Sequence, residues 1–173
     1  MEIALVSSSC IKLRGKQASL VIHPDASAKT AADGVLVFDT TPINDSKIEG
    51  SRLTVQGIGE YEVGGIKISA GGNKEAGFIY TVKIDGLEVL IAKTGALEKE
   101  QDKLKESDVM VLRCDGSINQ SVIPAISPKL LVLFGEKCEE IVKSLGKENS
   151  TPVSKVQVTA DKLPIEMEVT VLE

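Results

Sequence analysis

The stretch Gly57-Ile58-Gly59-Glu60-Tyr61-Glu62-Val63-Gly64-Gly65 places glycines on both sides of a short run of larger side chains. Glycine adopts positive φ angles without strain and lets neighbouring backbones approach closely. Residues 60–63 predict a strand, and 66–69 predict a second strand directly after Gly64-Gly65. We therefore interpret this stretch as structural, a tight turn region within a sheet.

Short strands dominate the first half of the chain on both sides of this stretch. Residues 35–38, Val-Leu-Val-Phe, form a continuous apolar run, which is typical of a strand buried on both faces. Ile84-Asp85-Gly86-Leu87 predicts a β-hairpin, because Asp-Gly suits a type I′ turn. Apolar or alternating runs predict further strands at 3–6, 10–13, 19–22, 52–56, 78–84 and 87–92.

Helices and strands alternate in the second half. Helical spacing predicts helices at 96–106, 118–126 and 136–145, the second interrupted at Pro124 and the third followed by Gly146. Apolar runs predict strands at 109–112, 130–134 and 166–172. Many strands and few helices indicate one domain over residues 1–173, with two sheets covered by helices, of the α/β or α+β class.

Composition excludes several classes of protein. With 173 residues, 42% of them hydrophobic and 26% charged, the chain is typical of a globular protein. Its formal net charge of −5 opposes nucleic-acid binding, which needs a basic surface to neutralise phosphates. Neither a signal peptide nor a bilayer-spanning run is expected. Three widely spaced cysteines without a CxxC motif favour a reducing, cytoplasmic location.

The block 57–65, the hairpin 84–87 with Thr94-Gly95, and the segment 163–169 together resemble the metallo-β-lactamase superfamily. The resemblance is to its ascorbate-6-phosphate-lactonase-like branch and covers nearly the whole chain. It implies a compact version of the four-layer αββα sandwich. Members of that superfamily activate water with one or two metal ions held by histidines and aspartates, so the resemblance also implies a metal site at the corresponding positions.

Most residues at the ligand positions implied by this resemblance cannot bind metal. Where the family has a His-X-His-X-Asp-His motif, this chain has Asp39-Thr40-Thr41-Pro42-Ile43-Asn44, and only Asp39 is a competent ligand. Gly72, Lys93 and Gly135 stand at or near a family histidine, the bridging aspartate and the last histidine. We call the following set the vestigial pocket: Asp39, Thr41, Asn44, Asp45, Gly72, Lys93 and Gly135. A catalytic zinc needs about three protein ligands, so we expect no metal and no cofactor.

Lys93 suggests how the pocket is stabilised without metal. A metal site leaves carboxylates facing a concentrated positive charge, and an ammonium at the bridging position supplies such a charge. We therefore predict an ion pair between Lys93 and either Asp39 or Asp45. The alternative is a lysine that extends from a strand end into solvent.

Other candidate residues have structural interpretations that we favour. His23, the one histidine, is a ligand or general base in one interpretation and a polar surface residue in the other. Ser7-Ser8-Ser9-Cys10 lacks a nucleophile-elbow motif and is interpreted as strand and turn packing, and the cysteines as core residues. Asp39, Asp45, Asp115 and Glu60 are candidates for an oxygen-only Mg²⁺ or Ca²⁺ site, and Gly71-Gly72-Asn73 for a phosphate cradle or a hairpin turn.

These observations favour a catalytically silent protein of the metallo-β-lactamase type, kept as a binding or structural module. The resemblance implies a homo-oligomer, with an unidentified protein or small-molecule partner. The alternative is a hydrolase of lactones or phosphoesters with a rebuilt non-zinc or metal-free site. A third hypothesis, nucleic-acid binding, is opposed by the acidic net charge.

Overall fold

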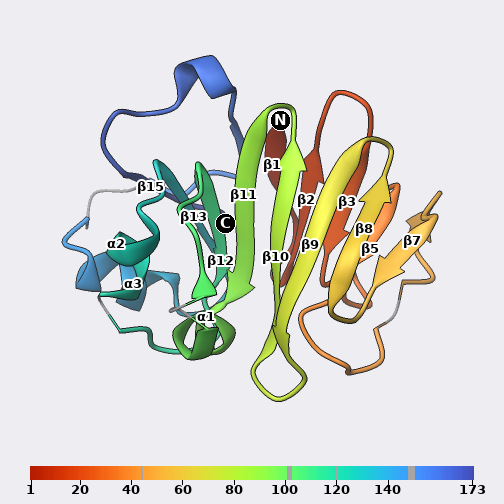
Figure 1. Cartoon of the computed structure of the whole chain (residues 1–173), viewed down its shortest axis with the longest axis horizontal. Coiled ribbons are helices and arrows are strands. Elements are labelled where there is room, and N and C mark those ends of the chain that lie inside the picture. Colours follow the sequence, from red (N-terminus) through yellow and green to blue (C-terminus); the bar gives the residue numbers. More distant parts are fainter. Residues whose placement is uncertain (44, 101–102, 120, 148–150) are drawn as a thin grey trace.

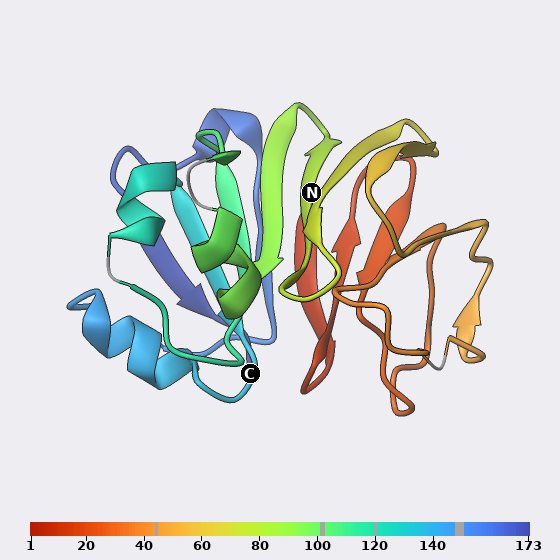
Figure 2. The same cartoon turned by 60° about the horizontal axis from the view of Figure 1, so that its bottom comes forward.

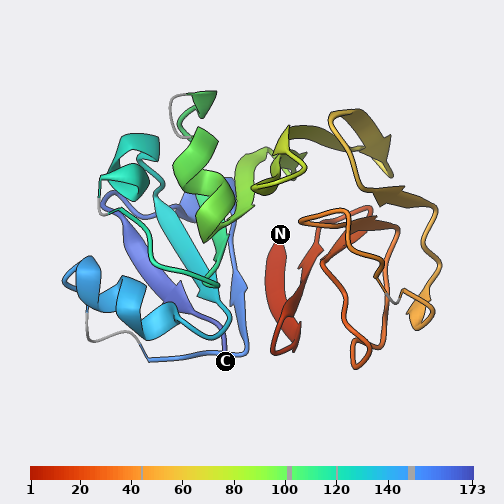
Figure 3. The same cartoon turned by 90° about the horizontal axis from the view of Figure 1, so that it is seen from below.

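Two β-sheets pack face to face at the centre of the molecule, as the views in Figure 1 and Figure 3 show. The computed structural model describes residues 1–43, 45–100, 103–119, 121–147 and 151–173. The predicted site residue Asn44 and parts of the predicted 96–106 and 118–126 helices therefore lie outside the described residues.

The first sheet has six strands, in the order β14-β1-β2-β3-β5-β7. They are β1 (Glu2–Ser7), β2 (Cys10–Arg14), β3 (Ser19–Ile22), β5 (Gly34–Leu36), β7 (Leu53–Val55) and β14 (Lys155–Gln157). Strands β1, β2 and β3 are antiparallel, whereas β3, β5 and β7 run parallel.

The second sheet has seven strands, in the order β15-β13-β12-β11-β10-β9-β8. They are β8 (Gly59–Val63), β9 (Ile66–Asn73), β10 (Gly77–Ile84), β11 (Leu87–Lys93), β12 (Val109–Arg113), β13 (Leu130–Phe134) and β15 (Glu168–Val171). Strands β8 to β11 form antiparallel hairpins, and β11, β12, β13 and β15 are parallel.

Alternation along each strand builds two layers of core on the seven-stranded sheet. Residues such as Ile91 and Val111 pack into the core between the sheets. Their neighbours Leu90 and Leu112 face the opposite way and pack beneath helices. These helices are α1 (Thr94–Glu100), α2 (Val122–Ile126) and α3 (Cys138–Ser144) (Figure 2). A short 3-10 helix, η2, at Ala160–Lys162 has no buried residue.

Loops and two very short strands cover the outer face of the six-stranded sheet. Ala28, Ala32 and Ile48 from these loops pack on Val21 and Val35 of the sheet. The short strands are β4 (Thr30–Ala31) and β6 (Ile48–Glu49). In the αββα scheme α1, α2 and α3 thus occupy one outer layer, and the segments around β4 and β6 form the other.

The predicted class and most predicted strands are confirmed. Asp85 and Gly86 have φ angles of 53° and 81°, as the type I′ hairpin requires. The predicted 118–126 helix begins later, at Val122, which places Pro124 in the first turn, where its missing N–H costs little. The strand at 35–38 ends at Leu36. Strands β4, β6 and β14 had no sequence signal, because each is two or three residues long.

Several hydrogen bonds tie the two sheets together at one end. The Phe78 N–H donates to the Phe38 carbonyl at 2.7 Å. The buried Tyr80 hydroxyl donates to the carbonyl of Val37 and lies 3.1 Å from that of Val55. These contacts position the segment that leads into Asp39. No helix in the described chain is long and apolar enough to cross a membrane.

Candidate functional site

The candidate site lies where β11 and β12 end. Lys93 is the last residue of β11, Arg113 is the last of β12, and the two are register partners in parallel strands. They continue the rows of Ile91 and Val111, so both side chains project towards the six-stranded sheet. Two positive charges therefore lie next to each other at one end of the space between the sheets.

The ion pair expected at Lys93 is present. The Lys93 Nζ lies 3.6 Å from Asp39 Oδ2, and the two side chains are only 19% and 28% exposed. Of the two predicted partners, Asp39 is thus the one that pairs. Asp45 is exposed, and its backbone carbonyl accepts the Ile48 N–H at 2.8 Å.

The loop after Phe38 is organised around the Asp39 carboxylate. Asp39 Oδ1 accepts the Thr41 N–H at 3.0 Å, and the Gln56 amide donates to the Asp39 carbonyl at 3.2 Å. Burial raises the pKa of Asp39, but hydrogen bonds from Thr41 and the positive charge of Lys93 outweigh it and lower the pKa below its usual value. Asp39 is therefore ionised at neutral pH.

Gly77 makes room for this ion pair, which the sequence analysis did not foresee. A Cβ atom at Gly77 would lie 2.5 Å from Lys93 Cε and 2.8 Å from the Phe38 carbonyl oxygen. Its φ of 112° also lies in the region that favours glycine. The sequence gives no distinctive signal for a glycine at this position, since the requirement arises from contacts between the sheets.

His23 is half-buried beside the site, so its interpretation as a surface residue is wrong. Its Nδ1 accepts the Phe38 N–H at 3.3 Å, and its ring contacts the Phe38 ring at a centroid distance of 5.5 Å. Burial and the nearby Arg113 charge lower the pKa of His23, against a smaller opposing effect of Asp39. The imidazole is therefore neutral at pH 7, with its proton on Nε2.

A second carboxylate, Asp25, forms the centre of a serine cluster that sequence reasoning missed. The hydroxyls of Ser7, Ser9 and Ser27 each donate to Asp25 at 2.5 Å. The Ala28 N–H donates to it at 3.0 Å. Although burial acts in the opposite direction, these hydrogen bonds hold the pKa of Asp25 far below its usual value. The predicted structural role of the serine run is supported, since its hydroxyls serve a loop carboxylate.

Gly72 and Gly135 have backbone roles. Gly72 has a φ of 90° and lies near the end of β9. Gly71, Gly72 and Asn73 are the last residues of β9 and not the predicted turn, which follows at 74–76, where the Asn73 side chain accepts the Ala76 N–H at 2.7 Å. Gly135 has a φ of 105°, and a Cβ there would lie 3.2 Å from the Cys114 carbonyl oxygen. With Ser8, Gly135 lines a separate cavity of about 890 Å³ beside α3.

The residues present do not fit a catalytic metal. Within the described ranges, no three His, Cys, Asp or Glu side chains gather in a way that could hold an ion. Two carboxylates considered for an oxygen-only site are used elsewhere: Asp115 accepts the Thr94 hydroxyl at 2.6 Å, and Glu60 accepts the Ser69 hydroxyl at 2.7 Å. The strand-end site instead carries an ammonium beside its one well-placed carboxylate, and a cation there opposes metal binding.

Comparison with solved structures defines the class of fold. A protein of Thermotoga maritima assigned as a Zn-dependent hydrolase of the metallo-β-lactamase superfamily matches with a TM-score of 0.80 and 16% identity, over 99% of this chain and 98% of that one. The metallo-β-lactamase fold protein YhfI of Bacillus subtilis matches with a TM-score of 0.62 and 10% identity, over 99% and 96% of the two chains. A protein of Parabacteroides distasonis assigned as a metal-dependent hydrolase matches with a TM-score of 0.61 and 15% identity, over 99% and 93%.

The chain therefore has the metallo-β-lactamase fold. No family model matches its sequence, and no curated protein is similar to it in sequence. At these identities the solved structures establish the fold alone, and the activity must be argued from the residues of this chain.

Proposed function

We propose that the protein is a metal-free, non-catalytic form of the metallo-β-lactamase fold, of the lactonase-like type, that acts as a binding or structural module. The observation that supports this most directly is the Lys93–Asp39 ion pair at the end of β11. The resemblance expects a metal-bridging aspartate at position 93. An ammonium there repels a metal ion and engages the carboxylate that would bind one.

The neighbouring groups do not supply a substitute for metal-activated water. The Nδ1 of His23 is engaged by the Phe38 N–H, which leaves only the protonated Nε2 free of that contact. Asp25 is a weak base, because the hydroxyls around it lower its pKa. Hydrolysis without metal requires an activated nucleophile or a base of suitable pKa, and neither group meets that requirement.

The proposed module binds a protein or small-molecule partner. It also assembles as a homo-oligomer, by analogy with the lactonase-like branch. A cytoplasmic location belongs to the same proposal, because the three cysteines are all free. The rival function is a hydrolase of lactones or phosphoesters with a rebuilt site that uses Asp39.

Elemental mass spectrometry of the purified protein tests the proposal. The protein is incubated with Zn²⁺, Mn²⁺ and Mg²⁺, desalted and analysed beside the variants Asp39→Ala and Lys93→Met. The proposal expects no retained metal in the native protein and no turnover of lactones or phosphoesters. Stoichiometric metal that is lost in Asp39→Ala would overturn it and favour the hydrolase.

A further inference from the structure

Two cysteines that lie far apart in the sequence meet at the ends of neighbouring strands. Cys114 directly follows β12, and Cys138 is the first residue of α3, which follows β13. The Cys114 N–H donates to the Phe134 carbonyl at 2.8 Å. The Lys137 N–H donates to the Cys114 carbonyl at 3.0 Å. The backbone thus holds the residue before Cys138 directly against Cys114.

The two cysteines lie in the same core cluster, and their thiols influence each other's pKa. The Cys138 thiol lies 3.2 Å from the Gly135 carbonyl oxygen, and the Cys114 thiol 3.6 Å from that of Leu112. Both are reduced in this structure and largely buried, with Cys114 1% and Cys138 6% exposed. The third cysteine, Cys10, begins β2 in the other sheet and packs in a different core. The chain therefore contains one close thiol pair and one separate cysteine that serves as an internal control.

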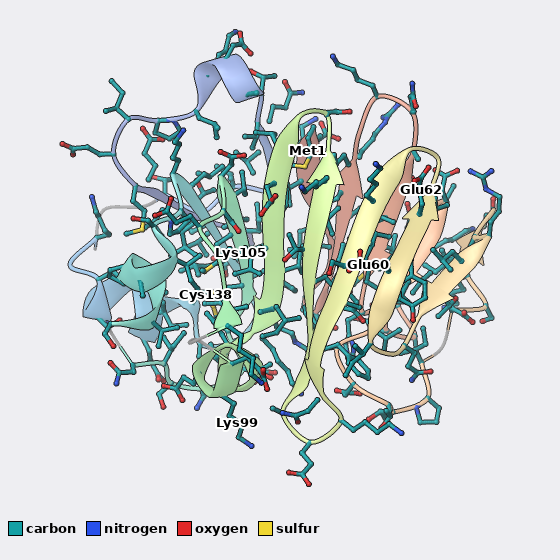
Figure 4. The ribbon with its side chains drawn as sticks, in the orientation of Figure 1. Met1, Glu60, Glu62, Lys99, Lys105 and Cys138 are labelled. Carbon is teal, nitrogen blue, oxygen red and sulfur yellow. The ribbon has the colours of Figure 1, made fainter. Side chains whose placement is uncertain are left out.

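Access distinguishes the two members of the pair. Cys138 lines the cavity of about 890 Å³ beside α3, together with Gly135 and Ser8. Figure 4 places Cys138 on the helix-bearing side of the seven-stranded sheet. A small molecule that enters the cavity therefore contacts Cys138, whereas Cys114 does not line the cavity.

The pKa shifts also distinguish Cys138 from Cys114, in the same order as access to the cavity. The hydrogen bond with Cys138 and burial both raise the pKa of Cys114. The hydrogen bond from Cys114 lowers the pKa of Cys138, against the opposing effects of burial and of Glu173. Because the thiolate is the nucleophile in disulfide exchange, Cys138 is the more reactive member.

We propose that Cys114 and Cys138 form a reversible disulfide by exchange with a small disulfide such as oxidised glutathione, with Cys138 as the attacking thiol. The Cys138 thiolate attacks one glutathione sulfur, which breaks the glutathione disulfide and releases one glutathione thiolate. The resulting mixed disulfide is then attacked by the Cys114 sulfur, whose proton leaves to solvent, and a second glutathione is released. The protein loses two electrons and two protons, and oxidised glutathione is reduced to two glutathione thiols.

The disulfide would link the end of β12 to the first residue of α3, on the wall of the cavity. This inference is independent of the proposed function, because neither cysteine belongs to the Lys93–Asp39 site. It adds a modification site to a region that the sequence analysis assigned only to core packing.

Peptide mapping of the full chain tests the proposal. The protein is equilibrated with oxidised and reduced glutathione, quenched with acid, alkylated in denaturant and digested with trypsin. Cleavage after Lys12, Arg113, Lys129 and Lys137 places the three cysteines on separate peptides. We expect the native protein to lose two of its three free thiols and Cys10→Ser to lose both of its two, each with a link between the Cys114 and Cys138 peptides.

Single variants test the order of the steps. Cys114→Ser should stop at a glutathione adduct on Cys138, whereas Cys138→Ser should form neither adduct nor link. Three free thiols in the native protein after equilibration with excess oxidised glutathione, or a link that involves Cys10, would overturn the proposal. The result for the native protein decides whether the disulfide forms, even if a variant does not fold.

Discussion

The loops around Asp25 and Asp39 both present a carboxylate at one end of the molecule, but they stabilise it in different ways. Asp25 is surrounded by neutral donors, the hydroxyls of Ser7, Ser9 and Ser27. Asp39 accepts hydrogen bonds from Thr41 and lies beside a lysine ammonium from the opposite sheet. The first carboxylate is satisfied within its own sheet and loops, whereas the second depends on how the two sheets are packed together.

Gly77→Ala, which disturbs the packing around Lys93 and Asp39 but not the Asp25 cluster, is expected to reduce stability most. The added methyl group meets the Phe38 carbonyl at 2.8 Å and Lys93 Cε at 2.5 Å, on a backbone with a φ of 112°. We expect a loss of about 3 kcal/mol in the free energy of unfolding, from strain and from displacement of Lys93. Urea denaturation measures it.

Gly71→Ala is the matched control for Gly77→Ala. No atom lies within 4 Å of a Cβ built at Gly71, so its effect should stay within about 1 kcal/mol. Equal losses for the two variants would contradict the close packing between Gly77 and the ion pair.

Asp25→Asn is expected to have the next largest effect. It keeps the shape of the side chain but removes the charge that three hydroxyls share, and should cost about 2 kcal/mol. Because the native pKa of Asp25 is lowered, its ionised form stabilises the fold above the usual carboxyl pKa. That stability is lost as the pH falls below this value.

Urea denaturation between neutral pH and pH 3 checks both parts of this prediction. The acid-induced loss of stability should be smaller in Asp25→Asn than in the native protein. Ser27→Ala, which removes one hydroxyl donor, serves as the milder control. An unchanged pH dependence in Asp25→Asn would show that the serine cluster does not hold the carboxylate in its charged form.

Lys93→Met tests the other side of the comparison and should have the smallest effect on stability. The pair is partly exposed and its ions are 3.6 Å apart, so its removal should cost about 1 kcal/mol. A double-mutant cycle with Asp39→Asn isolates the pair from other effects of each substitution. A coupling energy of zero would mean that the two groups are neighbours without a stabilising interaction.

The sequence predicted those parts of the fold and site that depend on local pattern. Continuous apolar runs identified β12 and β13, and Asp-Gly identified the β10–β11 hairpin. An ion pair of Lys93 with Asp39 or Asp45 was also predicted, because the resemblance placed an ammonium where a carboxylate would otherwise lack a counter-charge, and Asp39 is the partner in the structure.

Features that depend on contacts between distant segments were missed. One donor to Asp25 is Ser7 on β1, whereas Asp25 lies in the loop after β3, and no spacing rule in the sequence connects the two residues. The need for glycine at position 77 comes from Phe38 and Lys93 in three dimensions. Cys114 and Cys138 meet only because parallel β12 and β13 end side by side.

The central claim is that the Lys93 ammonium supplies positive charge to Asp39 in place of a metal ion. Its most direct test is the pKa of the Asp39 carboxyl group, measured by carbon-detected NMR titration in the native protein and in Lys93→Met. The account predicts a native pKa below the usual aspartate value and a higher pKa in the variant. The same Asp39 pKa in both proteins would contradict it.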